Sequence, residues 1–266
     1  MRRPLRPTEG DRRERFFREA ARFTDVVAVE AHGLTFLVPT ADASAGERFF
    51  RTRTGSEFVV LERVCERIET RGVFIDVGAN IGTTTLTALK RFDSAVAVEA
   101  EPRNATLLRA NAALNRLDER VIVHEAACSS ASGNVELRLS EKHGGHAVGP
   151  PKPGEPSLEV TAVPLDDLIT ADRIPASDVG VVWMDVGGHE EEVLRGAMRL
   201  LESRVAIVAE IRSRTARGVV DVLGERYTRA TDLRSEADLP VEELPEYLSR
   251  LGERGGRKFT DVLILE

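Results

Sequence analysis

The chain is poor in several features that mark large protein classes. Its 266 residues include only 2 cysteines, Cys65 and Cys128, and these lie far apart. Without tight spacing they indicate reduced thiols in a cytoplasmic protein rather than a disulfide framework. No apolar run reaches the length of a membrane span, and the charged N-terminus is not followed by the apolar core of a signal peptide. We therefore expect a cytoplasmic location and no membrane partner.

An excess of positive charge is also missing. The formal net charge is −7, with 30% charged and 42% hydrophobic residues. Because a nucleic-acid footprint normally needs a basic surface to neutralise phosphates, we expect no nucleic-acid partner. The length and the apolar fraction suffice for a full core, in one domain or in a domain with a cap.

Two common nucleotide-binding signatures are absent, namely G-x-G-x-x-G and the Walker lysine. In their place stands a short apolar run, Val73 to Val77, followed by Gly78 and Gly82. The run is typical of an interior strand of a parallel sheet, interrupted only by Asp76. The glycines permit a sharp turn close to a ligand, and a helix can start at Thr83. This spacing favours a nucleoside with a small polar tail, such as S-adenosylmethionine, over a pyrophosphate or a triphosphate.

Three further apolar runs end in acidic residues. Val96 to Glu99 ends in a carboxylate that can accept hydrogen bonds from ribose hydroxyls. Val121 to Glu125 is followed by two alanines, which leave room for an adenine ring. Val179 to Met184 ends at Asp185. Because ligands of doubly wound sheets lie beyond the carboxyl ends of the strands, we expect Asp185, Asp76 and Glu99 in one crevice.

These motifs resemble those of the FkbM-type S-adenosylmethionine-dependent methyltransferases. The resemblance is carried by the glycine turn and by five later stretches: 76–82, 99–102, 126–127, 132–137, 165–168 and 183–190. It implies an α/β fold, the Rossmann-like doubly wound sheet of class I methyltransferases, mostly parallel with an antiparallel last strand. The predicted domains are an N-terminal helical and hairpin cap, 1–54, and a methyltransferase domain, 55–266. The implied cofactor-binding residues are Asp76, Gly78, Asn80, Gly82, Glu99, Ala100, Glu125, Ala126 and Ala127. For Glu125 a surface carboxylate is the alternative.

Methyl transfer to an oxygen requires aligned donor and acceptor, and removal of the hydroxyl proton helps the reaction. Asp185 and His189 follow the fourth strand and are the predicted catalytic residues. Asp185 could instead position the substrate or bind the donor's ammonium group, and His189 could cap the next helix. His143 and His146 are further candidates for the base. A divalent metal held by Asp185, His189 and Asp166 is an alternative that we do not expect.

The chain departs from the family where a glutamate usually precedes a glycine, because Gly187 stands there. This departure leaves the acceptor open. The resemblance implies that the acceptor is a hydroxyl of a small molecule, such as a sugar or a polyketide-derived metabolite. The alternatives are methylation of an amide, carbamoyl or amino nitrogen, a NAD-type oxidoreductase, and a nucleoside-binding module without catalysis.

The N-terminal region is predicted to hold a helix over 12–23, capped by Asp11, and a hairpin over 26–38. The helix could dock on its own domain, dock on the second subunit of a homodimer, or act as an arm that caps the substrate. Phe50 and Arg53 are candidates for closing over the site, with plain packing as the alternative.

Two antiparallel strand pairs are also expected. Residues 134–139 and 158–163 alternate apolar and polar side chains and should pair across a loop. Residues 226–230 and 259–265 should form the closing antiparallel pair of the main sheet. The segment between them, 238–256, is charged and predicted to face solvent for the most part.

Overall fold

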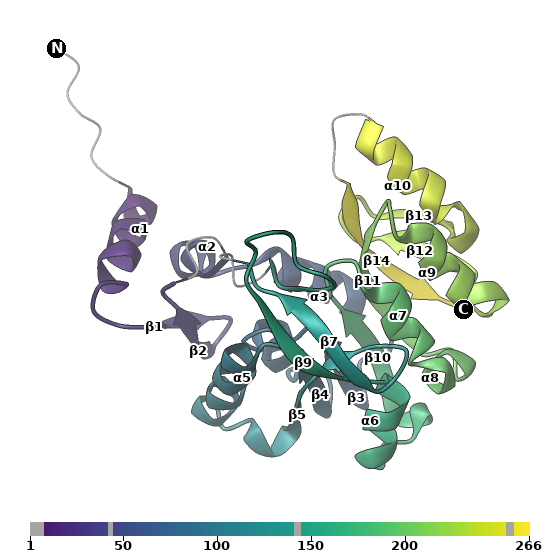
Figure 1. Ribbon diagram of the computed structural model, residues 1–266, viewed down its shortest axis with the longest axis horizontal. Helices are drawn as coiled ribbons and strands as arrows, with labels where there is room; N and C mark the ends of the chain where they lie inside the picture. Colours follow the sequence, from purple (N-terminus) through teal and green to yellow (C-terminus); the bar gives the residue numbers. More distant parts are fainter. Residues whose placement is uncertain (1–7, 42–44, 141–144, 254–257) are drawn as a thin grey trace.

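A computed structural model describes residues 8–41, 45–140, 145–253 and 258–266. Its centre is an eight-stranded sheet, flanked by a two-stranded and a four-stranded sheet (Figure 1). From one edge to the other, the central strands are β13 (Ala237–Pro240), β12 (Arg229–Asp232), β14 (Phe259–Leu265), β11 (Ala206–Arg212), β10 (Val179–Met184), β3 (Val73–Val77), β4 (Ser94–Glu99) and β5 (Val121–Glu125).

The strand order confirms the predicted doubly wound fold. β3 is parallel to β4 on one side and to β10 on the other, so the chain order reverses between β3 and β10. β14 runs antiparallel to both β11 and β12, which confirms the predicted antiparallel closing pair. The reversal point is where a doubly wound sheet places its ligand crevice.

Helices cover both faces of this sheet. One face packs against α3 (Ser56–Cys65), α4 (Thr83–Ala88) and α5 (Pro102–Leu114), and the other against α6 (Leu165–Ala171), α7 (Glu190–Arg195), α8 (Met198–Glu202), α9 (Ala216–Leu223) and α10 (Leu244–Glu253). Along β3 the side chains alternate between the two cores. Val73, Ile75 and Val77 belong to the second face, and Phe74 to the first. Burial on both faces explains why the strands read as nearly continuous apolar runs. Within the described ranges, every helix is too short or too polar to span a bilayer.

The N-terminal segment holds α1 (Glu9–Ala20), the hairpin β1 (Val26–Ala31) and β2 (Leu34–Pro39), and α2 (Ala45–Thr52). The hairpin is confirmed, but the prediction that Asp11 is the N-cap of the first helix is wrong. Thr8 is the N-cap, and Asp11 lies three residues into the helix, where its carboxylate accepts from the Thr8 N–H at 2.8 Å. The pair forms a capping box. In Figure 1, α1 lies at the outer edge of the molecule, on the opposite side from α10.

One buried asparagine, Asn111 of α5, joins the hairpin to the turn that follows β3. The Leu37 N–H donates to Asn111 Oδ1 at 2.6 Å, and Asn111 Nδ2 donates to the Ile81 carbonyl at 2.9 Å. Phe36 and Val38 of β2 lie in the same core as Phe74. The N-terminal segment therefore packs as part of the main core rather than as a separate layer.

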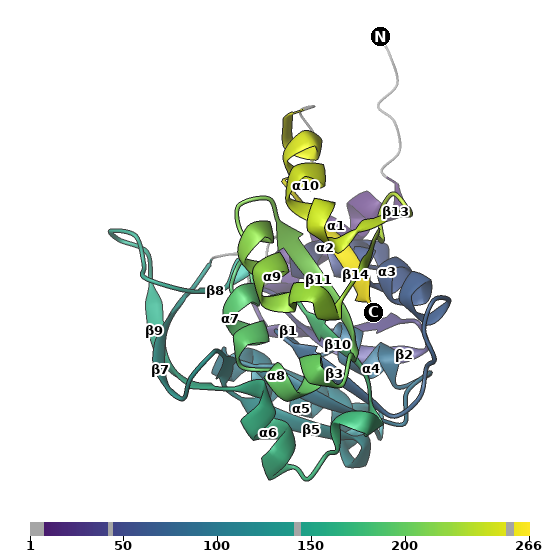
Figure 2. The ribbon, with the colours of Figure 1, turned by 90° about the vertical axis from the view of Figure 1, so that its right-hand side faces the viewer.

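The four-stranded sheet contains β6 (Ala127–Cys128), β9 (Ser157–Val163), β7 (Gly133–Arg138) and β8 (Ala147–Val148), in that order. β7 and β9 pair antiparallel, with Leu137 opposite Leu158, as predicted. Figure 2 shows this pair projecting beyond the helices that cover the central sheet. Of the two further histidines proposed as the base, His143 lies outside the described residues.

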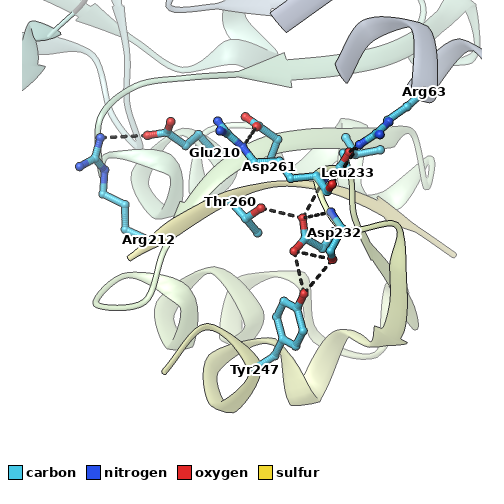
Figure 3. Close-up of polar contacts among 10 residues, drawn as sticks. Arg63, Glu210, Arg212, Asp232, Leu233, Tyr247, Thr260 and Asp261 are labelled. Carbon is cyan, nitrogen blue, oxygen red and sulfur yellow. Dashed lines mark hydrogen bonds and ion pairs between the residues drawn. The ribbon is translucent and has the colours of Figure 1, made fainter. Parts of the chain in front are cut away.

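The C-terminal end of the chain is organised around Asp232, which is buried (Figure 3). Its carboxylate accepts from Tyr247 Oη at 2.7 Å and from Thr260 Oγ1 at 2.7 Å. Burial alone would raise the pKa of Asp232, but these hydrogen bonds outweigh it and lower the pKa. Most described residues of 238–253 are exposed or half-buried, as predicted, while α10 buries Leu244 and Leu248 against α9.

Candidate active site

A cavity opens at the carboxyl ends of β3, β4 and β10. Its wall combines acidic, amide and small apolar side chains. Nine of the predicted site residues line it: Asp76, Gly78, Asn80, Glu99, Ala100, Ala126, Ala127, Asp185 and His189. The structure thus brings together most of the residues that sequence reasoning selected.

Gly78 allows the turns after β3 and β10 to touch. It has φ +86°, and a Cβ at this position would lie 2.2 Å from the Asp185 carbonyl oxygen. The Asp185 N–H donates to the Val77 carbonyl at 3.0 Å, and the Gly78 N–H donates to the Val98 carbonyl at 2.9 Å. Any side chain at Gly78 would push these strand ends apart.

Glu99 fixes the floor of the cavity. It is 7% exposed, and its two carboxylate oxygens accept from the Asn80 N–H and the Glu101 N–H, each at 2.8 Å. Burial raises the pKa of Glu99 to about 7, although these hydrogen bonds act in the opposite direction. The Asn104 side chain gives a further hydrogen bond to this carboxylate, and the lone pairs that remain can accept a hydrogen bond from a ribose hydroxyl.

Asp76 lies beside Glu99 at the end of β3, where it is 2% exposed. Its carboxylate accepts from Thr85 Oγ1 at 2.5 Å, so the acid is tied to the helix that follows the glycine turn. Burial raises the pKa of Asp76 to about 6 despite this bond. Two buried acids in contact with the cavity are well placed to receive donor groups of a ligand.

Two predicted cofactor residues do not line the cavity. Gly82 has φ +84° and is the N-cap of α4, and a Cβ there would lie 2.9 Å from Leu108 Cγ. The missing side chain allows close packing between α4 and α5. Glu125 is exposed and pairs with Arg109 at 3.1 Å on the outside of the sheet. The alternative interpretation of Glu125, a surface carboxylate, describes its position.

Asp185 lies where two cavities meet. It lines the first cavity and also a second one that is lined by Arg138, Arg212 and Arg214. Asp185 is exposed to these cavities, yet the protein atoms around it limit its solvation. Burial raises the pKa of Asp185 well above its usual range, and the carboxylate of Glu210 raises it further. A carboxylate of this kind is a stronger base than an ordinary aspartate.

His189 lines the first cavity only. It occupies the N-cap position of α7 but makes no side-chain capping bond. Its Nε2 lies 3.1 Å from Ser129 Oγ, and burial lowers the pKa of its imidazole. The ring is therefore neutral near pH 7 and able to accept a proton.

Four other candidate residues were named from the sequence: Asp166, Phe50, Arg53 and His146. Asp166 lies away from both cavities, and its carboxylate accepts from the Arg199 N–H at 2.8 Å, at the start of α8. Phe50 stacks on Phe16 with ring centroids 5.7 Å apart, and Arg53 is exposed. His146 lines both cavities. In the part of the chain that the structure describes, no group of three or more His, Cys, Asp or Glu side chains is arranged to hold a metal ion.

Sequence reasoning missed several residues of the cavity wall. Asn104 is 2% exposed, and its Oδ1 has no hydrogen-bond partner among the described residues. In the sequence, Asn104 could have been recognised as a polar side chain on the buried side of the helix that begins at Pro102. Glu57, Cys128 and Trp183 also line the cavity. Burial raises the pKa of the Cys128 thiol to about 12, so this cysteine remains protonated and inert.

Comparison with known proteins now adds an independent observation. The family model described as the methyltransferase FkbM domain matches residues 76–254. The chain belongs to the FkbM methyltransferase family. The matched region of this FkbM-family protein includes the glycine turn, all the acids at the strand ends and Asp232.

Three individual proteins that are similar to the chain share between 10% and 30% of the aligned residues with it. The hexuronic acid methyltransferase AglP of Haloferax volcanii is 30% identical over 185 residues, which are 69% of this chain and 70% of that protein. Among solved structures, the putative transferase PH0793 of Pyrococcus horikoshii has a TM-score of 0.50 at 10% identity, over 91% of this chain and 71% of that one. The FkbM methyltransferase of Methylobacillus flagellatus gives 0.45 at 14% identity, over 85% of this chain and 53% of that one. The FkbM-family chain thus spans about half the length of the Methylobacillus protein. The likeness to PH0793 shows the fold alone.

The two acids at the ends of neighbouring strands give a matched test of the donor site. Glu99→Gln should weaken binding of S-adenosylhomocysteine roughly 10- to 100-fold, because a hydrogen bond to a charged group is worth about 1.5–3 kcal/mol. Glu125 is paired with Glu99 in the sheet register, yet its carboxylate lies outside the cavity. Glu125→Gln should therefore leave the affinity unchanged. Isothermal titration calorimetry measures the affinity of both variants for S-adenosylhomocysteine. Equal losses of affinity in the two variants would contradict a role of Glu99 in binding this ligand.

The raised pKa of Asp76 predicts that its ionised carboxylate lowers the free energy of unfolding at high pH. The pKa rises from 3.8 to about 6 on folding, so the native state binds more protons between these values and stability falls as pH rises through them. Above pH 6 the full cost, on the order of 3 kcal/mol, is present, and below about pH 4 it is absent. Asp76→Asn should thus raise the unfolding free energy at pH 8 by roughly 1–3 kcal/mol, and by much less at pH 4.

Urea unfolding at the two pH values measures this difference. Asp118→Asn, at an exposed aspartate, serves as the control and should change neither value. An Asp76→Asn protein no more stable than the parent at pH 8 would show that the buried carboxylate carries no such cost.

Proposed function

We propose that the protein transfers the methyl group of S-adenosylmethionine to a hydroxyl oxygen of a sugar-containing small molecule. The observation that carries this proposal is the position of Asp185 between two cavities. One cavity has the acids and small residues suited to a nucleoside. The other offers a separate space for an acceptor beside the same carboxylate.

The donor would lie along the ends of β3, β4 and β5. Glu99 would accept hydrogen bonds from the ribose hydroxyls, and the Gly78 turn would pass close to the amino-acid tail. Ala126 and Ala127, both buried at the cavity wall, leave a flat space for the adenine ring. The sulfonium methyl would then face Asp185.

The reaction is an in-line displacement. The acceptor oxygen forms a bond to the methyl carbon while the carbon–sulfur bond breaks, which leaves S-adenosylhomocysteine. The hydroxyl proton passes to the Asp185 carboxylate. Because burial and neighbouring acids raise the pKa of Asp185, its proton affinity lies closer to the operating pH, as efficient general-base catalysis requires. His189 is the second candidate base, with its neutral ring facing the donor cavity only.

The sugar class rests on the similarity to AglP, which is named as a hexuronic acid methyltransferase. A polar acceptor also suits the second cavity, which is lined by charged side chains on several sides. Such a lining favours a hydroxyl-rich molecule over an apolar metabolite.

An assay with S-adenosylmethionine and a panel of sugars and glycosides tests the proposal. We expect sugar-dependent release of S-adenosylhomocysteine, with a product whose methyl group survives mild alkali, as an ether does. A methyl group that alkali removes would indicate an ester and contradict transfer to a hydroxyl. Absence of S-adenosylmethionine binding would contradict the proposal as a whole.

Asp185→Asn should lower kcat roughly 10²- to 10⁴-fold, the usual contribution of a general base, and leave S-adenosylhomocysteine affinity nearly unchanged. In the parent enzyme kcat/KM should fall as pH decreases through a value well above the normal aspartate range, because the base must be ionised. A kcat for Asp185→Asn within a few-fold of the parent value would rule out Asp185 as the base.

A further inference from the structure

The second cavity beside Asp185 has an unusual concentration of arginine. Its wall contains Arg138 from β7, Arg212 from β11 and Arg214 from the turn that follows. None of the three lines the first cavity. Guanidinium groups from two distant parts of the chain, Arg138 on one side and Arg212 with Arg214 on the other, therefore line one space.

These arginines have few partners of their own. Within the described residues, the side chains of Arg138 and Arg214 make no ion pair or hydrogen bond, and Arg138 Nε is buried without an acceptor, whereas Arg214 is exposed. Arg212 Nη2 donates to Glu210 at 2.9 Å (Figure 3), but its Nε is also buried without an acceptor. The two buried Nε–H groups are costly to leave unpaired, so they favour an anionic acceptor in this cavity.

The surrounding backbone makes room for this charge. Gly188 has φ +109°, and a Cβ there would lie 2.8 Å from Arg214 Nη2. The ring of Phe259 packs on the guanidinium of Arg212, with the Cζ atom 5.6 Å from the ring centroid. Such stacking fixes the plane of the guanidinium and leaves its edge for hydrogen bonds.

The acids of this cavity do not cancel the charge. Glu210 is already paired with Arg212, and its cross-strand neighbour Asp261 is paired with Arg234 at 2.5 Å. Asp185 is the remaining carboxylate of the wall. Even with Asp185 ionised, Arg138 and Arg214 leave the cavity with a net positive charge.

We propose that this arginine-lined cavity binds a carboxylate of the acceptor, so that the substrate is an acidic sugar of the uronic acid type. The inference rests on the proposed function and specifies its substrate class. Arginine is suited to this task because its planar fork of N–H groups matches a carboxylate with two parallel hydrogen bonds. With the carboxylate held by the arginines, a ring hydroxyl of the same sugar can lie against Asp185, next to the donor cavity.

Binding of two matched sugars tests the proposal without relying on turnover. The protein is first saturated with S-adenosylhomocysteine and then titrated with methyl glucuronide or methyl glucoside, which differ in having a carboxylate or a hydroxymethyl group. We expect the glucuronide to bind roughly 10- to 100-fold more tightly, as charge-assisted hydrogen bonds would give. Glucose 6-phosphate is the third probe, and we expect it to bind more weakly than the glucuronide.

Variants then connect the preference to the arginines. Arg138→Gln and Arg214→Gln should each reduce glucuronide affinity about tenfold or more, with little change for the glucoside. Arg217→Gln is the matched control, because Arg217 is exposed on α9 and lies outside the cavity. Unchanged S-adenosylhomocysteine binding in all three variants would show that they fold.

The outcomes separate this inference from the function on which it rests. Failure to bind S-adenosylhomocysteine would defeat the proposed function itself. Normal S-adenosylhomocysteine binding with no preference for the glucuronide, including no binding of either sugar, would overturn only the carboxylate pocket. Tighter binding of glucose 6-phosphate would indicate a phosphate pocket and would likewise overturn the uronic acid assignment.

Discussion

The site depends on the close contact between the turns after β3 and β10. At this point Gly78 lies against the Asp185 backbone, with room for no side chain between them, and the Asp185 N–H is bonded to the Val77 carbonyl. The contact carries the Asp185 side chain to the wall of the first cavity. Because both turns leave parallel strands of one sheet, the fold sets the position of Asp185 relative to the Gly78 turn.

The second constraint is electrostatic. Asp76 and Glu99 are buried, and this burial raises the pKa of both carboxyl groups. Such groups weaken the fold and gain hydrogen-bond partners when a ligand supplies donors. Asp185 is more exposed, and desolvation together with the carboxylate of Glu210 raises its pKa. The neighbouring acids Glu210 and Asp261 are offset by arginines on the adjacent chain segments, whereas the buried Glu190 keeps one carboxylate oxygen without a partner among the described residues.

Much of this arrangement could be predicted from the sequence, because strand ends in a parallel sheet have a known place. Apolar runs that end in Asp76, Glu99 and Asp185 were enough to locate the crevice. The G-x-x-x-G spacing, however, could not tell which glycine faces the ligand, and Gly82 packs against Leu108 instead. Glu125 also ends a strand, but the pairing with Arg109 that holds it outside depends on a helix far away in the sequence.

The arginine-lined cavity could not be predicted for a similar reason. Arg138 is on an outer sheet, whereas Arg212 and Arg214 follow the fifth strand of the main sheet, and only the folded chain brings them together. Nothing in their local sequence distinguishes them from the many arginines on the surface. Their lack of partners is a property of the three-dimensional structure alone.

A crystal structure with S-adenosylhomocysteine and an acceptor sugar bound together tests the central claim most directly. The account predicts ribose hydroxyls on Glu99, the donor sulfur facing Asp185, and an acceptor hydroxyl about 3 Å from the Asp185 carboxylate. An adenosyl group bound away from Gly78 and Glu99, or an acceptor whose reacting oxygen lies out of reach of Asp185, would contradict it.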